Sequence, residues 1–212
     1  MTAWTPAAPS SFAALSVGLF GGSFNPAHDG HRHIALTALA ALGLDEIWWL
    51  VSPQNPLKPR DGTMPLADRL ASAARQARHP AMRVTDLEAE LGTTFTAETL
   101  AGIKAKYPRH KFVWIMGADN LVQIPAWKDW LRIFHTVPVA VFARPSYSVA
   151  ALSGVAAQRF ARRRVPEYHA RRLARRGPPA WTFVHCRLHA ASASAIRAGL
   201  APASQASFPA DG

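Results

Sequence analysis

The sequence predicts an α/β fold, in which a doubly wound, mostly parallel β-sheet carries helices on both faces. Short apolar runs alternate along the chain with longer segments whose apolar residues recur at helical spacing. Two of the apolar runs end directly in glycine, at Gly21-Gly22 and at Gly117. Strands that alternate with helices form a parallel sheet of the Rossmann-like type, in which ligands bind at the carboxyl ends of the strands.

The first half of the chain is expected to contribute three strands and three helices. The strands are short apolar runs at residues 17–20, 47–51 and 82–85. The helices have apolar residues at helical spacing, at residues 31–42, 65–77 and 97–106. We expect Gly43 to end the first helix, and the first strand to run into a tight turn at Gly21-Gly22.

The second half is expected to repeat this alternation. Apolar runs predict strands at residues 111–116, 137–143 and 181–184. Helical patterns predict a short helix at 127–134, a basic helical region at 152–176 and a last helix at 194–198. The first of these strands runs into Gly117-Ala118-Asp119, which would lie at the same sheet edge as Gly21-Gly22.

Length and composition limit the class of protein. With 212 residues, 49% of them hydrophobic, the chain is expected to form one domain (1–212), with 1–14 and 203–212 as candidate flexible tails. The single cysteine, Cys186, argues against an internal disulfide framework or a cysteine-based zinc cluster and suits a reducing compartment. No basic start of a secretory signal is present, and the apolar run at 34–44 is far shorter than the ~20 residues that cross a bilayer. We therefore expect a soluble, cytoplasmic protein that does not bind membranes.

The positive charge of the chain is concentrated in one segment. The formal net charge is +11, and the segment from Arg159 to Arg176 holds eight arginines against one acid, Glu167. Such a segment fits a polyphosphate site, an RNA-binding helix or a solvated helix face, of which the last is the most common.

The residue string with the most chemical information is 21–31, Gly-Gly-Ser-Phe-Asn-Pro-Ala-His-Asp-Gly-His. Glycines directly after a strand let backbone N–H groups approach an anion closely. The helix that begins near Gly30 directs its positive end toward the same space. His28 and His31 lie three residues apart across this helix start, so both imidazoles can face one phosphate chain.

Other interpretations of this string are weaker. Neither the Gly-Lys-Ser/Thr of a Walker phosphate loop nor the Gly-x-Gly-x-x-Gly of dinucleotide oxidoreductases is present. The histidines could be metal ligands, but no third ligand stands at a convincing spacing. They could also be ordinary surface histidines, although the whole string after a first strand argues against chance.

Together these residues resemble a known family. The string 21–31 resembles the signature of the nucleotidylyltransferase superfamily, whose hallmark is His-x-Gly-His. Later segments narrow the resemblance to the bacterial nicotinate-nucleotide adenylyltransferases. These are the loop at 52–58, the Thr-x-x-Thr-Leu element within 93–100, the acidic loop and tryptophan at 117–120 and 127–130, the Arg-Pro-Ser-Tyr at 144–147 and the closing motif at 192–197.

The chain departs from the family pattern at two places. Ser146 stands where the family usually has glycine. The closing motif reads Ser-Ala-Ser-Ala-Ile-Arg where Ser-Ser-Thr-x-Ile-Arg is usual, so Ala193 lacks a hydroxyl while Ser194 keeps one. Arg197 is retained, and a guanidinium suits phosphate oxygens.

The resemblance implies a role for individual residues. It implies catalytic roles for His28 and His31. It implies that ATP contacts Gly21, Gly22, Ser23, Phe24, His28, His31, Gly117, Asp119, Ser194, Ile196 and Arg197. It implies that the mononucleotide contacts Asn25, Ser52, Lys58, Thr94, Thr96, Trp127, Lys128 and Arg144.

Several of these residues have a plain structural alternative. Asp119 could bind ribose hydroxyls or magnesium, or cap a helix. Thr96 could bind the acceptor's carboxylate or cap the helix that follows it. Trp127 and Trp130 could both belong to the core by their spacing, and the resemblance makes Trp127 alone a ligand residue. Lysines and arginines are more often surface charges than ligands, and only the resemblance makes Lys58 and Arg69 candidate ligands.

The resemblance implies that the chain transfers AMP from ATP to nicotinate mononucleotide, giving nicotinate adenine dinucleotide and pyrophosphate, in NAD biosynthesis. The implied cofactor is Mg²⁺, which the phosphates of ATP would hold, with Asp119 as the one protein ligand considered. The implied partners are these small molecules, and a homo-oligomer stays open. Two rivals are a phosphopantetheine adenylyltransferase and an RNA-binding protein that uses the arginine-rich segment. The first does not fit the Trp127 loop, and the second leaves the two histidines unexplained.

Overall fold

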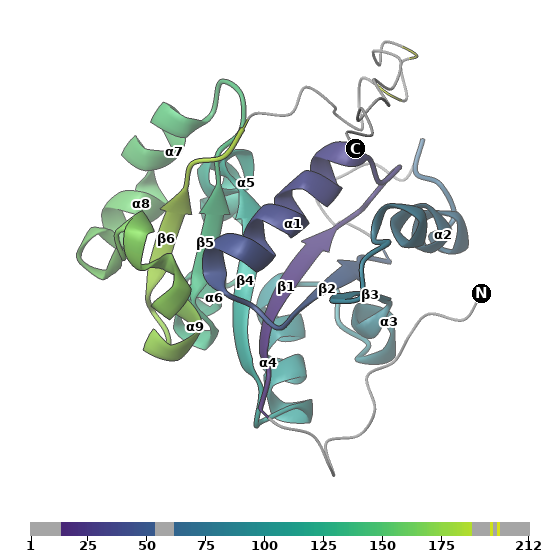
Figure 1. Ribbon diagram of the computed structural model, residues 1–212, viewed down its shortest axis with the longest axis horizontal. Coiled ribbons are helices and arrows are strands. Elements are labelled where there is room, and N and C mark those ends of the chain that lie inside the picture. Colours follow the sequence, from purple (N-terminus) through teal and green to yellow (C-terminus); the bar gives the residue numbers. More distant parts are fainter. Residues whose placement is uncertain (1–13, 54–61, 188–195, 197–198, 200–212) are drawn as a thin grey trace, which may run out of the picture.

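The structure, a computed structural model, describes residues 14–53, 62–187, 196 and 199. Its β-sheet has six parallel strands in the order β3-β2-β1-β4-β5-β6 (Figure 1). The strands are β1 (Ser16–Gly22), β2 (Glu46–Val51), β3 (Met82–Thr85), β4 (Lys111–Gly117), β5 (Val139–Phe142) and β6 (Trp181–Val184). Because β1 pairs with both β2 and β4, the direction of winding reverses between β1 and β4. The predicted doubly wound parallel sheet is confirmed.

Helices connect the strands and cover both faces of the sheet (Figure 1). The α-helices are α1 (Asp29–Leu42), α2 (Leu66–Gln76), α3 (Leu87–Glu90), α4 (Thr96–Lys106), α5 (Ala118–Gln123), α6 (Trp130–Thr136), α7 (Ser148–Ser153), α8 (Val155–Arg159) and α9 (Leu173–Arg176). Three short 3₁₀ helices are η1 (Ile124–Ala126), η2 (Ala161–Arg163) and η3 (Glu167–Arg172). In the described part of the chain, no helix has the length and apolar character needed to cross a bilayer.

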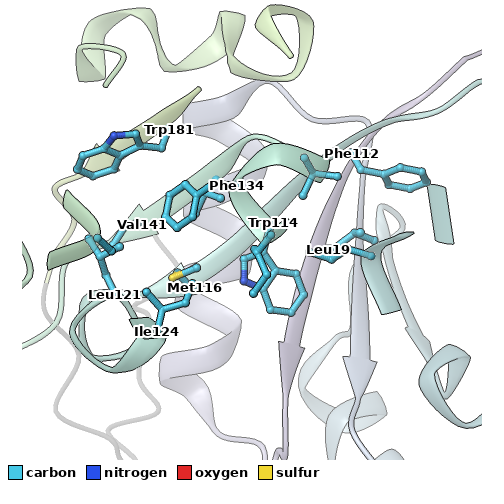
Figure 2. Close-up of a cluster of buried hydrophobic side chains, with 14 of the residues drawn as sticks. Leu19, Phe112, Trp114, Met116, Leu121, Ile124, Phe134, Val141 and Trp181 are labelled. Atoms are coloured by element: carbon cyan, nitrogen blue, oxygen red, sulfur yellow. The ribbon is translucent and has the colours of Figure 1, made fainter. Parts of the chain in front are cut away.

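The sheet separates two hydrophobic cores, because successive strand residues point to opposite faces. In β2, Trp48 points into the core shared with α4, α5 and α6, and Trp49 points into the core shared with α1, α2 and α9. Figure 2 shows part of the first core, with Trp114, Phe134 and Trp181 among its side chains. Burial on both faces explains why the strands are continuous apolar runs rather than alternating ones.

The observed helices and strands differ from the predictions in the connections. The strand β1 continues through Gly21 and Gly22, which pair with Leu50 and Val51, so the tight turn predicted there is wrong. Helices α3 and α5 were not predicted, because four and six residues are too short to show a helical period. The helix predicted at 127–134 starts only at Trp130, after Asp129 adopts a left-handed φ of 52°.

The basic helical region predicted at 152–176 is divided into several short helices. Gly154 separates α7 from α8, and the chain then forms a parallel bridge between Arg164 and Trp181 at the sheet. Pro166 follows this bridge, and a helix cannot run through it because proline lacks the backbone N–H that a helix interior requires. The predicted helix at 194–198 lies almost entirely outside the described residues, as do the two candidate tails.

Candidate active site

A cavity of about 570 Å³ opens at the carboxyl ends of the strands, beside the point where the winding reverses. Its volume lies within the range of ~300–1,000 Å³ that is usual for sites of organic ligands. Gly21 and Gly22 at the end of β1, Ser52 after β2 and Gly117 at the end of β4 form one side. Segments that follow β3 and β4, around α3, η1 and the start of α4, form the other side.

Glycine at the ends of β1 and β4 is required by neighbouring side chains. A Cβ on Gly21 would lie 2.1 Å from Cη2 of Trp114, which is far too close for a real contact. A Cβ on Gly117 would lie 2.3 Å from Oδ1 of Asp119 and 2.9 Å from Nε of Arg144. These glycines therefore allow the Trp114 ring and the Asp119–Arg144 pair to press against the backbone of the cavity wall.

The loop after β1 is held by aromatic packing. Phe24 has a left-handed φ of 44°, which is unusual for a bulky residue. Its buried ring packs edge-on against Phe20 and His31, at centroid distances of 5.5 and 5.0 Å, and tilted against Trp49 at 5.0 Å. This packing offsets the backbone strain and positions the neighbouring His31 ring.

The two histidines lie against each other at the start of α1. Their ring centroids are 3.8 Å apart, and His28 is the N-cap residue of the helix. The backbone N–H of His28 donates to Nδ1 of His31 at 3.2 Å. Because Nδ1 accepts this bond, the ring proton of a neutral His31 resides on Nε2, which is then a hydrogen-bond donor. His31 lines the cavity, whereas His28 is buried and does not.

Arg69 is a buried clamp and not a surface charge. It is 2% exposed, and its guanidinium donates to four backbone carbonyls. Nε donates to Met64 at 2.9 Å, Nη1 to Ser23 at 2.9 Å and to Ser52 at 2.5 Å, and Nη2 to Pro53 at 2.8 Å. The surface interpretation of Arg69 is therefore wrong, because the side chain joins the loop after β1 to the loop after β2.

Glu88 is a buried acid in the cavity wall that the sequence analysis did not select. The side chain is 5% exposed, and its Oε2 has no hydrogen-bond partner within the described part of the chain. Burial raises the pKa of the Glu88 carboxyl to about 7, against the opposing effects of a hydrogen bond with Ser52 and the charge of Arg69. Near neutral pH this carboxyl is present in both protonation states, so it can either donate or accept toward the cavity.

Asp119 and Arg144 form a loosely coupled ion pair on the cavity wall. Nε of Arg144 lies 3.7 Å from Oδ1 of Asp119, and neither atom has a hydrogen-bond partner among the residues that the structure describes. Gly117 is the N-cap residue of α5, so the helix-cap interpretation of Asp119 is wrong. Two buried polar atoms at this distance can both bond to one ligand group placed between them.

Thr96 and Trp127 lie in the same cavity wall. Thr96 is the first residue of α4 and does not cap it, since the N-cap residue is Phe95. Trp127 has extended backbone after η1, and its buried Nε1 lacks a partner in the described ranges. Trp130 instead packs edge-on against Phe134 in the core, at a centroid distance of 6.2 Å. Trp127 lines the cavity and Trp130 does not, while both rings pack against the first hydrophobic core; a contact of Trp127 with a ligand stays a prediction.

Lys128 is held near this wall by two contacts. Its Nζ lies 3.0 Å from Oε1 of Glu98 and 4.2 Å from the centroid of the Phe95 ring. An ammonium in this position contributes positive potential to the cavity, although its exposure to solvent screens the effect.

Most of the residues that the sequence analysis selected come together here. Every selected site residue that the structure describes lines the cavity except His28 and Ile196. Lys58, Ser194 and Arg197 lie outside the described residues, as does Ala193. The roles assigned to all these residues stay predictions.

Further residues that line the cavity could not be predicted from a motif: Phe20, Glu88, Phe95, Trp114, Asn120, Gln123 and Ala126. Strand alternation could have found Trp114, because it directs this ring to the face on which α4 and α6 pack. No sequence pattern marks Glu88, since acids at the start of a short helix are usually solvated.

A family model described as cytidylyltransferase-like matches residues 19–199. A probable nicotinate-nucleotide adenylyltransferase of Cereibacter sphaeroides is 54% identical over 184 residues, 87% of this chain and 97% of the relative. One of Rhizobium meliloti is 49% identical over 183 residues, 86% of this chain and 97% of the relative.

A solved structure is similar in fold. It is the Plasmodium falciparum nicotinic acid mononucleotide adenylyltransferase complexed with NaAD, with a TM-score of 0.64 and 15% sequence identity. The match covers 85% of this chain and 81% of that one. At 15% identity this structure supports the fold alone, whereas the two sequence relatives, at 54% and 49% identity, support the family.

Proposed function

The chain belongs to the cytidylyltransferase-like family, with close relatives named as nicotinate-nucleotide adenylyltransferases, and on this premise we propose that it transfers AMP from ATP to nicotinate mononucleotide. The products are nicotinate adenine dinucleotide and pyrophosphate, in NAD biosynthesis. The observation that carries the proposal is the gathering of the motif residues, from His31 to Arg144, around one cavity large enough for organic ligands. The free Cys186 thiol also suits the proposed cytoplasmic location.

The reaction requires alignment more than acid–base chemistry. An oxygen of the mononucleotide phosphate, already an anion, forms a bond to the α-phosphorus of ATP. The bond from the α-phosphorus to the bridging oxygen breaks, and its electron pair leaves with pyrophosphate. No proton has to move and no covalent enzyme intermediate is needed, so catalysis rests on positioning and charge stabilisation.

His31 has the geometry for charge stabilisation. Its Nδ1 accepts a backbone hydrogen bond from His28, so Nε2–H can donate to a phosphate oxygen on which charge develops. The ring is fixed by Phe24 and His28 before substrate arrives, at centroid distances of 5.0 and 3.8 Å. His28 would act mainly through His31 and through the start of α1.

Thr96 and Trp127 are the proposed readers of the nicotinate ring and its carboxylate. The Thr96 hydroxyl and the Trp127 Nε1–H are both donors in the cavity wall, and a carboxylate accepts without donating. The Asp119–Arg144 pair offers an acceptor and a donor side by side, which suits ribose hydroxyls or a phosphate oxygen.

Magnesium is proposed as the companion of ATP. Among the described residues no group of three or more acidic, histidine or cysteine side chains could hold a metal ion. The acidic oxygen proposed to reach such an ion is Oδ1 of Asp119, which is buried and without a hydrogen-bond partner in that part of the chain. This donor set suits an ion held mainly by phosphates and water, which would neutralise phosphate charge.

A pyrophosphate-release assay with a panel of acceptors tests the proposal. Purified protein receives ATP and Mg²⁺ with nicotinate mononucleotide, nicotinamide mononucleotide or phosphopantetheine. We expect the fastest release with nicotinate mononucleotide. Release with phosphopantetheine and none with either pyridine mononucleotide would overturn the substrate assignment.

A further inference from the structure

A second, smaller cavity lies among the arginines of the basic segment. Its volume is about 140 Å³, and its walls are Arg162, Arg163, Arg164, Arg176 and the turn 177–180. The turn directly precedes β6, so this cavity lies at the amino end of that strand. The active-site cavity lies at the carboxyl ends of the parallel strands, and the two cavities share no lining residue.

The arginines are brought together by structure and not by sequence proximity alone. The 3₁₀ helix η2 presents Arg162 and Arg163, and the bridge between Arg164 and Trp181 attaches the next residue to the sheet. The Arg164 guanidinium lies 5.4 Å from the centroid of the Trp181 ring. Arg176 lines the same cavity from the end of α9, and Gly177 after it has a left-handed φ of 71°.

The charge of this cluster is not balanced nearby. Among the residues that the structure describes, none of these four arginines has a carboxylate within ion-pair distance. The one acid of the segment, Glu167, is engaged with His185, whose Nδ1 lies 2.7 Å from Oε2 of Glu167. Four like charges around one hollow repel each other, so an anion that enters it is attracted by all four.

The chemistry of the cluster selects the kind of anion. All the cations of the segment from Arg159 to Arg176 are arginines, whose planar forks match phosphate oxygens better than a lysine does. The cavity is smaller than the ~300 Å³ at which sites for whole organic ligands begin. We propose that Arg162, Arg163, Arg164 and Arg176 form a binding site for a small phosphate anion with two or more negative charges, such as inorganic pyrophosphate.

Calorimetric titration with inorganic pyrophosphate in magnesium-free buffer tests this site. The test variant is Arg163→Gln/Arg176→Gln. The matched control is Arg159→Gln/Arg175→Gln, which removes the same charge from exposed arginines of the segment outside the cavity. We expect the test variant to weaken binding by about tenfold or more and the control to stay near wild type, because only the first loses charge-assisted hydrogen bonds. Thermal unfolding and turnover of both variants, which leave the active site intact, verify that they are folded.

A third variant distinguishes pyrophosphate binding at the active site from binding at the arginine cluster. His31→Ala should keep the affinity that Arg163→Gln/Arg176→Gln loses, since the two cavities lie at opposite ends of the sheet. Wild-type binding by the arginine variant, or equal losses in it and its charge-matched control, would overturn the proposal. A filter-retention assay with single-stranded RNA gives another refutation: retention that depends on Arg163 and Arg176, with unchanged pyrophosphate binding, would make the cluster a nucleic-acid surface.

Discussion

Replacing Glu88 with glutamine tests whether this buried carboxyl destabilises the protein once it ionises. The side chain is 5% exposed, and burial raises its pKa from 4.5 to about 7. Glutamine keeps the shape and can still bond to Ser52, but it cannot ionise. The variant therefore isolates the cost of the buried charge.

The magnitude follows from the two pKa values. They differ by about 2.5, and at about 1.4 kcal/mol for each pKa unit this amounts to about 3.5 kcal/mol. Between pH 4.5 and 7 the folded state binds more protons than the unfolded state, so the free energy of unfolding falls as the pH rises through this window. About 2.5 kcal/mol of the loss should develop between pH 5 and pH 8. The Glu88→Gln variant should not lose this free energy of unfolding, because glutamine does not ionise.

Urea unfolding of wild type and variant at pH 5 and pH 8 measures the effect. We expect the stability of Glu88→Gln relative to wild type to rise by about 2.5 kcal/mol between the two pH values. Glu90→Gln, at an exposed acid of the same short helix, serves as the control and should follow wild type. A relative stability of Glu88→Gln that is the same at both pH values would refute the argument.

Three further predictions concern the cavity. His31→Ala should lower kcat by ~10²–10³ while nucleotide binding changes little, because the donor acts on charge that grows in the transition state; a kcat within a few-fold of wild type would remove this histidine from the mechanism. The kcat/KM for nicotinate mononucleotide should exceed that for nicotinamide mononucleotide at equal salt, because an amide sets its own N–H₂ against the donors of the cavity wall. Thr96→Val should reduce this preference without altering ATP binding. Equal kcat/KM values for the two mononucleotides would contradict the proposed ring pocket. Gly21→Ala should cost about 1–3 kcal/mol in urea unfolding, since its Cβ would collide with the Trp114 ring at 2.1 Å, and an unchanged midpoint would contradict this packing.

Local patterns in the sequence were enough for the fold. Each of the six predicted strands is present with small changes at its ends, because an apolar run between turn residues has few alternatives to a buried parallel strand. Gly43 ends α1 as expected, with a left-handed φ of 61°. The structure shows a backbone cost at Ser146, which stands where the family usually has glycine. Its φ of 64° lies in the region that favours glycine.

The site could be predicted where a motif follows a strand directly. His31, Asp119 and Arg144 reach one cavity because parallel strands bring their carboxyl ends to the same edge. Contacts between segments far apart in sequence could not be predicted in this way. From the sequence Arg69 is expected to be a surface charge, and only the structure shows its four carbonyl partners in separate loops.

The sequence by itself determined the order of helices and strands, the edge of the sheet where ligands bind and the residue types available there, because each depends on neighbours along the chain. Only the tertiary structure decided which side chains are buried together. It placed Trp114 against Gly21, raised the pKa of Glu88 by burial and brought four exposed arginines together around one hollow at the amino end of β6. Burial and electrostatic potential depend on what surrounds a residue in space, and that surrounding does not exist until the sheet and its two layers of helices have formed.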